Sequence, residues 1–206
     1  MNFSEIKPRI YNYLGVKGIQ PSPENDELIL SCYTELEQIV QFNYIYKSYA
    51  APPDFLQKQP YTDFLAGTTG VILCATTIGT VIDRRIGRLT RTDLSRAIVL
   101  DACASAYLEA RADEYEKTIA DDLTYRFCPG YNGSSTDDLK HIFRLLRPEK
   151  IGITLNKSNF MLPSKSMAGI IGIGRSADKH CEDCIMQKKC RYREEGKRCY
   201  SSEKTS

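Results

Sequence analysis

The chain has 206 residues, 42% hydrophobic and 26% charged, which is ordinary for a soluble globular protein able to bury one good core. Its net charge of +2 is too small to indicate nucleic-acid binding, and no apolar run is long enough to cross a membrane. The N-terminus shows no apolar export segment, so a cytoplasmic location is expected, with the eight cysteines as thiols or metal ligands rather than disulfides.

The first part of the chain predicts two helices and an irregular aromatic segment. Residues 4–13 favour a short helix. Ser22 followed by Pro23 is typical of a helix start, and apolar residues at helical spacing continue that helix to about residue 39. Residues 42–55 are rich in aromatic residues without a clean period, which indicates extended segments around a turn. These aromatics suit packing better than base stacking, since no basic stripe runs between them.

The central part predicts a buried strand and two helices. Residues 70–78 form a continuous apolar and β-branched run, typical of a strand covered on both faces. A helix begins at residue 80 and reaches about residue 89. Asp93 is the expected cap of a long helix from residue 94 to about 121, whose small residues permit close packing.

Short strands and one helix complete the predicted domain. The expected elements are a strand over 123–127, a helix over 136–147, and sheet residues at 160–161 and 167–173. This mixture, without regular βαβ units, predicts an α+β fold with a mainly antiparallel sheet packed with helices. The composition becomes charged and cysteine-rich after Gly174, so we expect a domain over 1–174 and a Cys-rich tail over 175–206.

A binding motif begins at Arg126 with the sequence Arg-Phe-Cys-Pro-Gly-Tyr. A guanidinium can hold a carboxylate at two points, Pro-Gly lets the backbone approach a ligand closely, and Tyr131 offers a flat ring. Such a set suits a small zwitterionic ligand with an aromatic or cationic part. A strand end followed by a turn explains the same residues without any ligand.

The motif has a second part, Leu-Asn-Lys-Ser followed by Met-Leu-Pro-Ser-Lys-Ser over residues 155–166. In order and spacing, the two parts resemble the S-adenosylmethionine-binding stretch of the reactivation domain of cobalamin-dependent methionine synthase. The resemblance extends over about residues 5–174 and implies the fold of that domain.

The resemblance also implies a set of ligand-binding residues. The long helix matches an Asp-x-x-Ala-x-Ala-x-x-Glu pattern that begins at Asp101, and this match makes Glu109 the counterpart of a carboxylate near the ligand's amino group. A solvated helix face is the alternative for Glu109. Another binding carboxylate of the family and a later tyrosine contact have no counterpart in this sequence. The implied cofactor-binding residues are Glu109, Arg126, Cys128, Gly130, Tyr131, Ser164, Lys165 and Ser166.

The implied function is the reactivation of a corrinoid methionine synthase or a related methyltransferase. A reductant, such as an electron-donor protein, returns cobalt(II) to cobalt(I), and S-adenosylmethionine then methylates it. The chain would bind S-adenosylmethionine and dock on the partner's cobalamin domain. Cobalamin would belong to the partner, since this chain has no Asp-x-His-x-x-Gly motif. Whether the chain is itself an enzyme or only an accessory protein stays open.

The tail predicts a metal centre formed by Cys181, Cys184, Cys190 and Cys199. Four thiols that include a Cys-x2-Cys pair suit either zinc or a 4Fe–4S cluster, and their spacing does not choose between the two metals. A metal-free tail is the third possibility. An alternative function follows: an electron-transfer or interaction protein in which the metal centre is the working part and the ligand pocket is vestigial.

The remaining cysteines and one histidine favour structural roles. Cys32, Cys74 and Cys103 lie within apolar patterns and are expected to be small buried hydrophobic residues. His141 belongs to no cluster and is expected on a helix surface.

Overall fold

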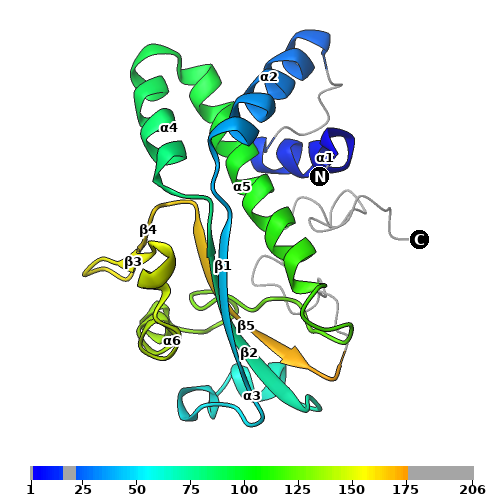
Figure 1. Cartoon of the computed structure of the whole chain (residues 1–206), viewed down its shortest axis with the longest axis vertical. Helices are drawn as coiled ribbons and strands as arrows, with labels where there is room; N and C mark the ends of the chain where they lie inside the picture. The colour runs from blue at the N-terminus through cyan, green and yellow to red at the C-terminus, as the bar shows by residue number, and fades with distance from the viewer. Residues whose placement is uncertain (1, 16–21, 176–206) are drawn as a thin grey trace.

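The computed structural model describes residues 2–15 and 22–175, so the cysteine-rich tail lies outside the described residues. Helices occupy the upper part of the molecule and one side of its lower part, around a narrow sheet (Figure 1). The helices are α1 (Phe3–Leu14), α2 (Pro23–Ile39), α3 (Tyr61–Phe64), α4 (Thr80–Thr92), α5 (Leu94–Glu116) and α6 (Leu139–Leu146). The strands are β1 (Asn43–Tyr49), β2 (Gly70–Thr77), β3 (Thr154–Leu155), β4 (Met161–Leu162) and β5 (Ser166–Ile173).

The main sheet is antiparallel and has the strand order β1-β2-β5. Every residue of β2 is buried, which confirms the prediction of a strand covered on both faces. Strands β3 and β4 form a separate hairpin. The α+β prediction with an antiparallel sheet is therefore confirmed, and β1, expected only as an extended segment, supplies one edge of that sheet.

The segment expected as a strand over 123–127 joins β5 through only two isolated bridges, Leu123 with Ile173 and Phe127 with Ile170. Three residues lie between the two bridges on this segment and two on β5, so the segment contains one extra residue. Such an insertion breaks the ladder and redirects the side chains between the bridges. The Thr124 hydroxyl accepts from the backbone N–H of Gly172 at 2.8 Å and thereby replaces a ladder bond.

Two caps expected from the sequence are present. The side chain of Ser22 accepts from the backbone N–H of Asn25 at 3.2 Å, and Asp93 accepts from that of Arg96 at 3.0 Å. The helix after Asp93 ends at Glu116 rather than near residue 121, because the chain turns there and the Thr118 hydroxyl donates to the Tyr115 carbonyl. The expected helix over 136–147 is divided into a 3-10 turn over Thr136–Asp138 and α6.

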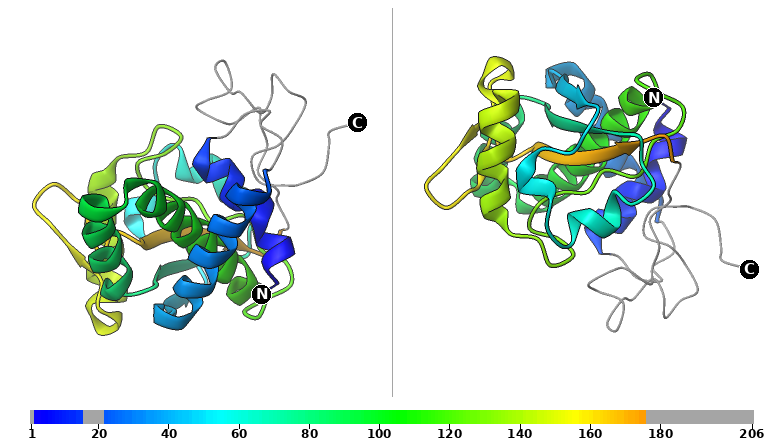
Figure 2. Two further views of the ribbon diagram at one scale, coloured as in Figure 1. Left: turned by 90° about the horizontal axis from the view of Figure 1, so that it is seen from above. Right: turned by 90° about the horizontal axis from the view of Figure 1, so that it is seen from below.

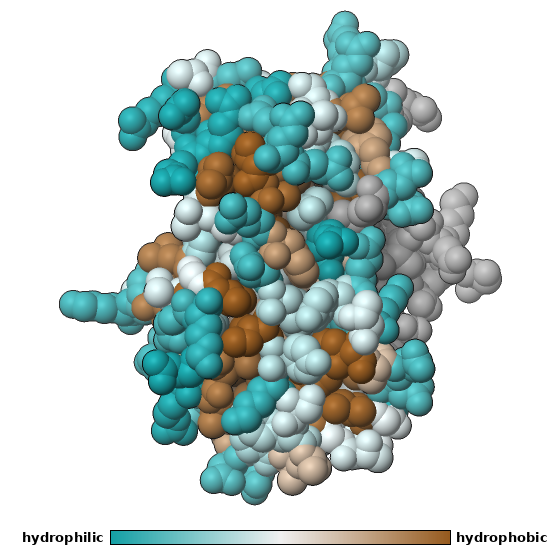
Figure 3. All heavy atoms as spheres, viewed as in Figure 1, coloured by the Kyte–Doolittle hydropathy of each residue, from teal (hydrophilic) through white to brown (hydrophobic). Residues whose placement is uncertain are grey.

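The hydrophobic core has two main parts, and α5 links the helical part to the sheet. The first part fills the space among α1, α2, α4 and α5, and the second lies between one sheet face and helices α3 and α6. In both views of Figure 2, α1 and α6 lie at opposite ends of the molecule. Hydrophobic side chains also reach the surface in several separate areas between hydrophilic ones (Figure 3).

The other sheet face has a small apolar cluster of Ile72, Cys74 and Ile171. Next to this cluster, the C-terminal end of α5 brings charged side chains over the sheet. The buried positions of Cys32, Cys74 and Cys103 agree with the expectation that these cysteines act as small hydrophobic residues. Among the described residues, no helix is both long enough and apolar enough to span a bilayer.

Candidate functional site

One side of α5 carries polar residues at successive turns. Asp101, Ser105, Glu109 and Asp113 follow at intervals of four residues, and Glu116 comes three residues later. Residues at these spacings lie above one another on a helix surface. The stripe is therefore a continuous polar edge, and residues from four other chain segments contact it.

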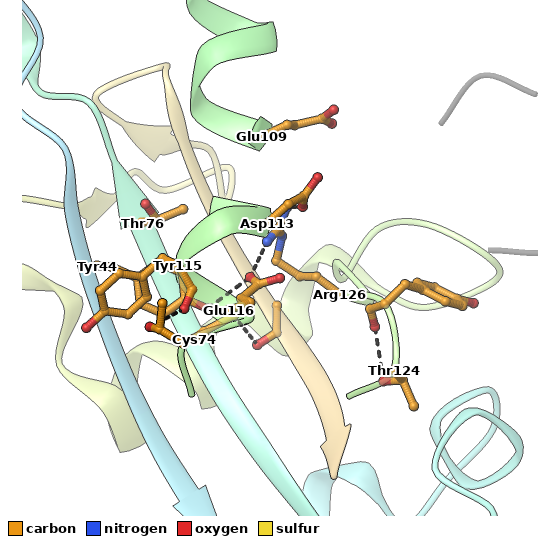
Figure 4. Close-up of polar contacts among 12 residues, drawn as sticks. Tyr44, Cys74, Thr76, Glu109, Asp113, Tyr115, Glu116, Thr124 and Arg126 are labelled. Carbon is orange, nitrogen blue, oxygen red and sulfur yellow. Dashed lines mark hydrogen bonds and ion pairs between the residues drawn. The ribbon is translucent and has the colours of Figure 1, made fainter. Parts of the chain in front are cut away.

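Arg126 contacts the C-terminal end of this stripe. Its Nη1 donates to Glu116, and its Nη2 donates to Asp113 Oδ1 at 3.2 Å (Figure 4). The side chain lies over Gly169, where an added Cβ would come within 2.5 Å of the Arg126 Cγ. Only 6% of the Arg126 side chain is exposed, so its guanidinium lies beneath the surface and is held by the protein's own carboxylates.

Glu116 links this ion pair to the sheet. Its Oε1 accepts from the Tyr44 hydroxyl at 2.9 Å, and Tyr44 lies on the same sheet face as Cys74. Burial raises the pKa of Glu116 above its ordinary value, against the opposing effect of Arg126. Burial alone would lower the pKa of Arg126, but the neighbouring Glu116 charge raises it, so the guanidinium stays charged. Burial raises the pKa of the Cys74 thiol to about 12, which makes this thiol unreactive.

The Pro-Gly-Tyr part of the motif forms two successive turns. The backbone N–H of Tyr131 donates to the Cys128 carbonyl at 3.3 Å, with Gly130 at φ 96°. Proline followed by a glycine of positive φ is typical of a type II turn. A side chain at Gly130 would also meet Thr136 at 2.8 Å. The turns hold Tyr131 with 64% of its surface exposed.

Glu109 lies one turn from Asp113, with its side chain directed away from the Arg126 pair (Figure 4). Its side chain is 35% exposed, and Arg9 of α1 lies 3.9 Å from its carboxylate. Burial raises the pKa of the Tyr13 hydroxyl, and the nearby Glu109 and Tyr131 raise it further. The structure thus brings Glu109, Tyr131 and the end of α1 together on one side of the molecule.

The three residues expected from the second part of the motif lie at the other end of β5. Ser164 donates to Asp83, and the Ser166 hydroxyl donates to that of Thr77 at 2.9 Å. Lys165 Nζ lies 2.8 Å from both Asp101 Oδ1 and Ser105 Oγ. Ser166 is three strand residues from Gly169, or about 10 Å. The two parts of the motif therefore contact opposite ends of the same α5 stripe rather than one another.

Five residues near the site were not expected from the sequence: Arg9, Tyr13, Tyr44, Asp113 and Glu116. Asp113 could have been predicted as a site residue, because it lies one helical turn after Glu109 on the same face of α5. No sequence pattern could have placed Arg9 and Tyr13 near the site, because the sequence does not show that α1 packs against α5. Among the described residues, no group of three or more histidine, cysteine or acidic side chains could hold a metal ion. The predicted ligands Cys181, Cys184, Cys190 and Cys199 lie outside the described residues.

Comparison with known proteins gives a match of fold. A crystal structure of the MetH reactivation domain bound to AdoHcy superposes with a TM-score of 0.59, covering 95% of this chain and 85% of that chain at 15% identity. The chain has the reactivation-domain fold. No protein-family model and no curated protein matches the sequence. At 15% identity, this structural likeness is evidence for the fold alone. The fold agrees with the expectation from the motifs.

Proposed function

We propose that this chain is a reactivation module that binds S-adenosylmethionine and docks on the corrinoid domain of a separate methionine synthase or related methyltransferase. The main support is the fold match to a domain solved with AdoHcy, the demethylated product of S-adenosylmethionine. A second support is that Glu109 and Tyr131 of the Pro-Gly-Tyr turn both lie near Tyr13, on one side of this fold.

The proposed binding surface uses few residues in distinct roles. Glu109 receives the ligand's ammonium group, and the exposed ring of Tyr131 offers a stacking face for the nucleoside. The turn at Cys128 and Gly130 brings backbone close to the ligand, as a glycine of positive φ allows. Arg126 orders the floor of this surface through Asp113 and Glu116. Ser164, Lys165 and Ser166 fix the far end of the α5 stripe.

In the proposed reaction, this chain supplies orientation and the partner's corrinoid supplies the reacting cobalt. The reaction would need one electron from an external reductant and the methyl group of the S-adenosylmethionine sulfonium, and AdoHcy would remain after the partner's reduced corrinoid accepted that group. Holding the donor over the corrinoid converts the methyl transfer into an intramolecular step. The proposal thus includes two other proteins: the corrinoid-binding partner and an electron donor.

Calorimetric titration with S-adenosylmethionine and AdoHcy tests the binding step. We expect wild-type protein to bind both ligands, and Glu109→Gln to weaken S-adenosylmethionine by about 10-fold, or about 1.4 kcal/mol. Glu114→Gln is the matched control, because Glu114 is on the same helix and forms an exposed ion pair with Arg111. If wild-type protein binds neither ligand, the proposed function is rejected.

The metal centre of the tail is a separate proposal with its own test. Cys181, Cys184, Cys190 and Cys199 would hold either zinc, as a structural site, or a 4Fe–4S cluster that relays the electron. Protein purified without oxygen would be colourless with one zinc per chain in the first case. It would be brown, with absorbance near about 400 nm, in the second. Protein that contains neither metal in stoichiometric amount would contradict both forms of the proposal.

A further inference from the structure

A second arginine, Arg9 of α1, reaches the same carboxylate as Arg126. The Nη1 of Arg9 donates to Asp113 Oδ2 at 2.9 Å, whereas Nη2 of Arg126 donates to Asp113 Oδ1 at 3.2 Å. Asp113 therefore bridges one arginine from α1 and one from the bulged segment beside β5. The two guanidinium groups differ in exposure and in how many of their donors are in use.

Arg126 has its two terminal nitrogens engaged, one by Glu116 and one by Asp113, and its side chain is 6% exposed. Arg9 is 29% exposed, and within the described part of the chain its ion-pair contacts, to Asp113 and Glu109, come from Nη1. Among the described residues, no hydrogen bond or ion pair involves Nε or Nη2 of Arg9. These two nitrogens form one edge of the planar guanidinium, which matches the two oxygens of a carboxylate.

We propose that Arg9 binds the α-carboxylate of the ligand, that Glu109 receives its ammonium group, and that Arg126 is a positioning residue that holds Asp113. This assignment rests on the function proposed above, and it places Arg9 at the ligand where the motif resemblance implies Arg126. The ligand class is an adenosyl amino acid with a free α-amino and α-carboxyl group.

The Arg9–Glu109 pair matches the head of an α-amino acid. Such a head carries opposite charges on adjacent groups, and Arg9 Nη1 lies 3.9 Å from Glu109 Oε2. The bond to Asp113 fixes the Arg9 guanidinium before a ligand arrives, which lowers the entropy lost on binding. Using Arg126 instead would require a ligand carboxylate to displace Glu116 or Asp113 from a nearly buried side chain.

The test is a thermodynamic cycle between the protein and the ligand carboxylate. Calorimetry measures the binding of S-adenosylmethionine and of its decarboxylated analogue to wild-type and Arg9→Met protein. Lys7→Met is the matched control, because Lys7 is on the same helix, is 30% exposed and forms a similar ion pair with Asp26 at 2.8 Å. Arg9→Lys keeps the charge and removes the planar fork.

We expect Arg9→Met to weaken S-adenosylmethionine by about 10- to 100-fold and the decarboxylated analogue by less than about 3-fold, since only the first ligand has the carboxylate. Lys7→Met should change both by less than about 2-fold, and Arg9→Lys should give an intermediate loss. Circular dichroism confirms that each variant is folded at the titration temperature.

Two negative results are distinguishable. If wild-type protein binds S-adenosylmethionine and Arg9→Met weakens both ligands equally or neither, the Arg9 assignment is wrong while the proposed function stands. If wild-type protein binds neither S-adenosylmethionine nor AdoHcy, the proposed function and this inference fail together.

Discussion

Two glutamates of this chain are each held by arginine, and their surroundings shift their pKa values in opposite directions. Glu35 of α2 accepts from Arg85 and from Arg96 on the surface of the helical part, and the bond from Arg85 lowers the pKa of Glu35 despite partial burial. Glu116 accepts from Arg126 beside the sheet, and burial raises its pKa. Water still reaches the first group, whereas the second has lost most of its hydration.

An arginine partner therefore does not by itself decide the direction in which the pKa of a carboxylate shifts. The Glu35 side chain is 20% exposed and that of Glu116 10%, but the partners differ more: Arg85 is 33% exposed and Arg126 6%. Removing a partially hydrated ion pair costs little, whereas removing one member of a buried pair leaves an uncompensated charge.

The largest expected effect follows from truncating each glutamate. Glu116→Ala should lower the free energy of unfolding by about 3–5 kcal/mol, because it leaves the Arg126 charge buried without its main partner. Glu35→Ala should cost about 1 kcal/mol, since Arg85 and Arg96 can turn to water. Urea unfolding measures both, with Glu114→Ala as the exposed control. Equal losses for the two variants would contradict the comparison.

A second prediction concerns the glycine beneath Arg126. Gly169→Ala should destabilise by about 1–3 kcal/mol, because the new Cβ would meet Arg126 Cγ at 2.5 Å and the Phe127 carbonyl at 3.1 Å. Gly87→Ala is the matched control within α4: nothing lies within 4 Å of its added Cβ, so it should stabilise by about 0.5–1 kcal/mol. Thermal unfolding measures both variants, and the unfolding midpoint should fall for Gly169→Ala and rise for Gly87→Ala. A neutral Gly169→Ala would mean that the arginine stem shifts freely.

A smaller effect is expected from the tyrosine that donates to Glu116. Tyr44→Phe should cost about 1 kcal/mol, because Glu116 then loses one hydrogen bond in a nearly buried place. Tyr46→Phe, two residues further on the same sheet face and 42% exposed, should change stability by less than about 0.5 kcal/mol. Urea unfolding at neutral pH compares the pair, and similar losses would argue against a special role for the Tyr44 hydroxyl.

The smallest effect is in the pH dependence of stability. Because the pKa of Glu35 is lowered from 4.5 on folding, its contribution is present above pH 4.5 and is lost as pH falls through the folded value. Glu35→Gln should therefore flatten the stability profile below pH 4.5. The pKa of Glu116 is raised from 4.5 on folding, so protonation of this carboxyl stabilises the folded state. That contribution is fully present below pH 4.5 and is lost as pH rises through the folded pKa.

The matched variant, Glu116→Gln, should therefore change the slope above pH 4.5 rather than below it. Thermal unfolding midpoints measured between about pH 3 and pH 7 distinguish an effect below pH 4.5 from one above it. If both variants change the same limb of the profile, the opposite pKa shifts are wrong.

The elements with local signals could be predicted from the amino-acid sequence. The apolar run that became β2, the caps at Ser22 and Asp93, and the turn at Gly130 all depend on residues close together in the chain. The mixture of helices and short strands also predicted the antiparallel α+β fold. The predicted metal ligands of the tail stay a prediction.

The contacts between distant segments could not be predicted from the sequence, because they depend on how the folded chain packs. The pairing of β1 with β2, the extra residue between Leu123 and Phe127, and the contact of Arg9 with Asp113 depend on packing across long separations. The structure likewise buries Arg126 between Glu116 and Asp113, and no sequence signal predicted either contact. Propensity and spacing describe neighbours along the chain, whereas burial and pairing depend on which segments the folded core brings together.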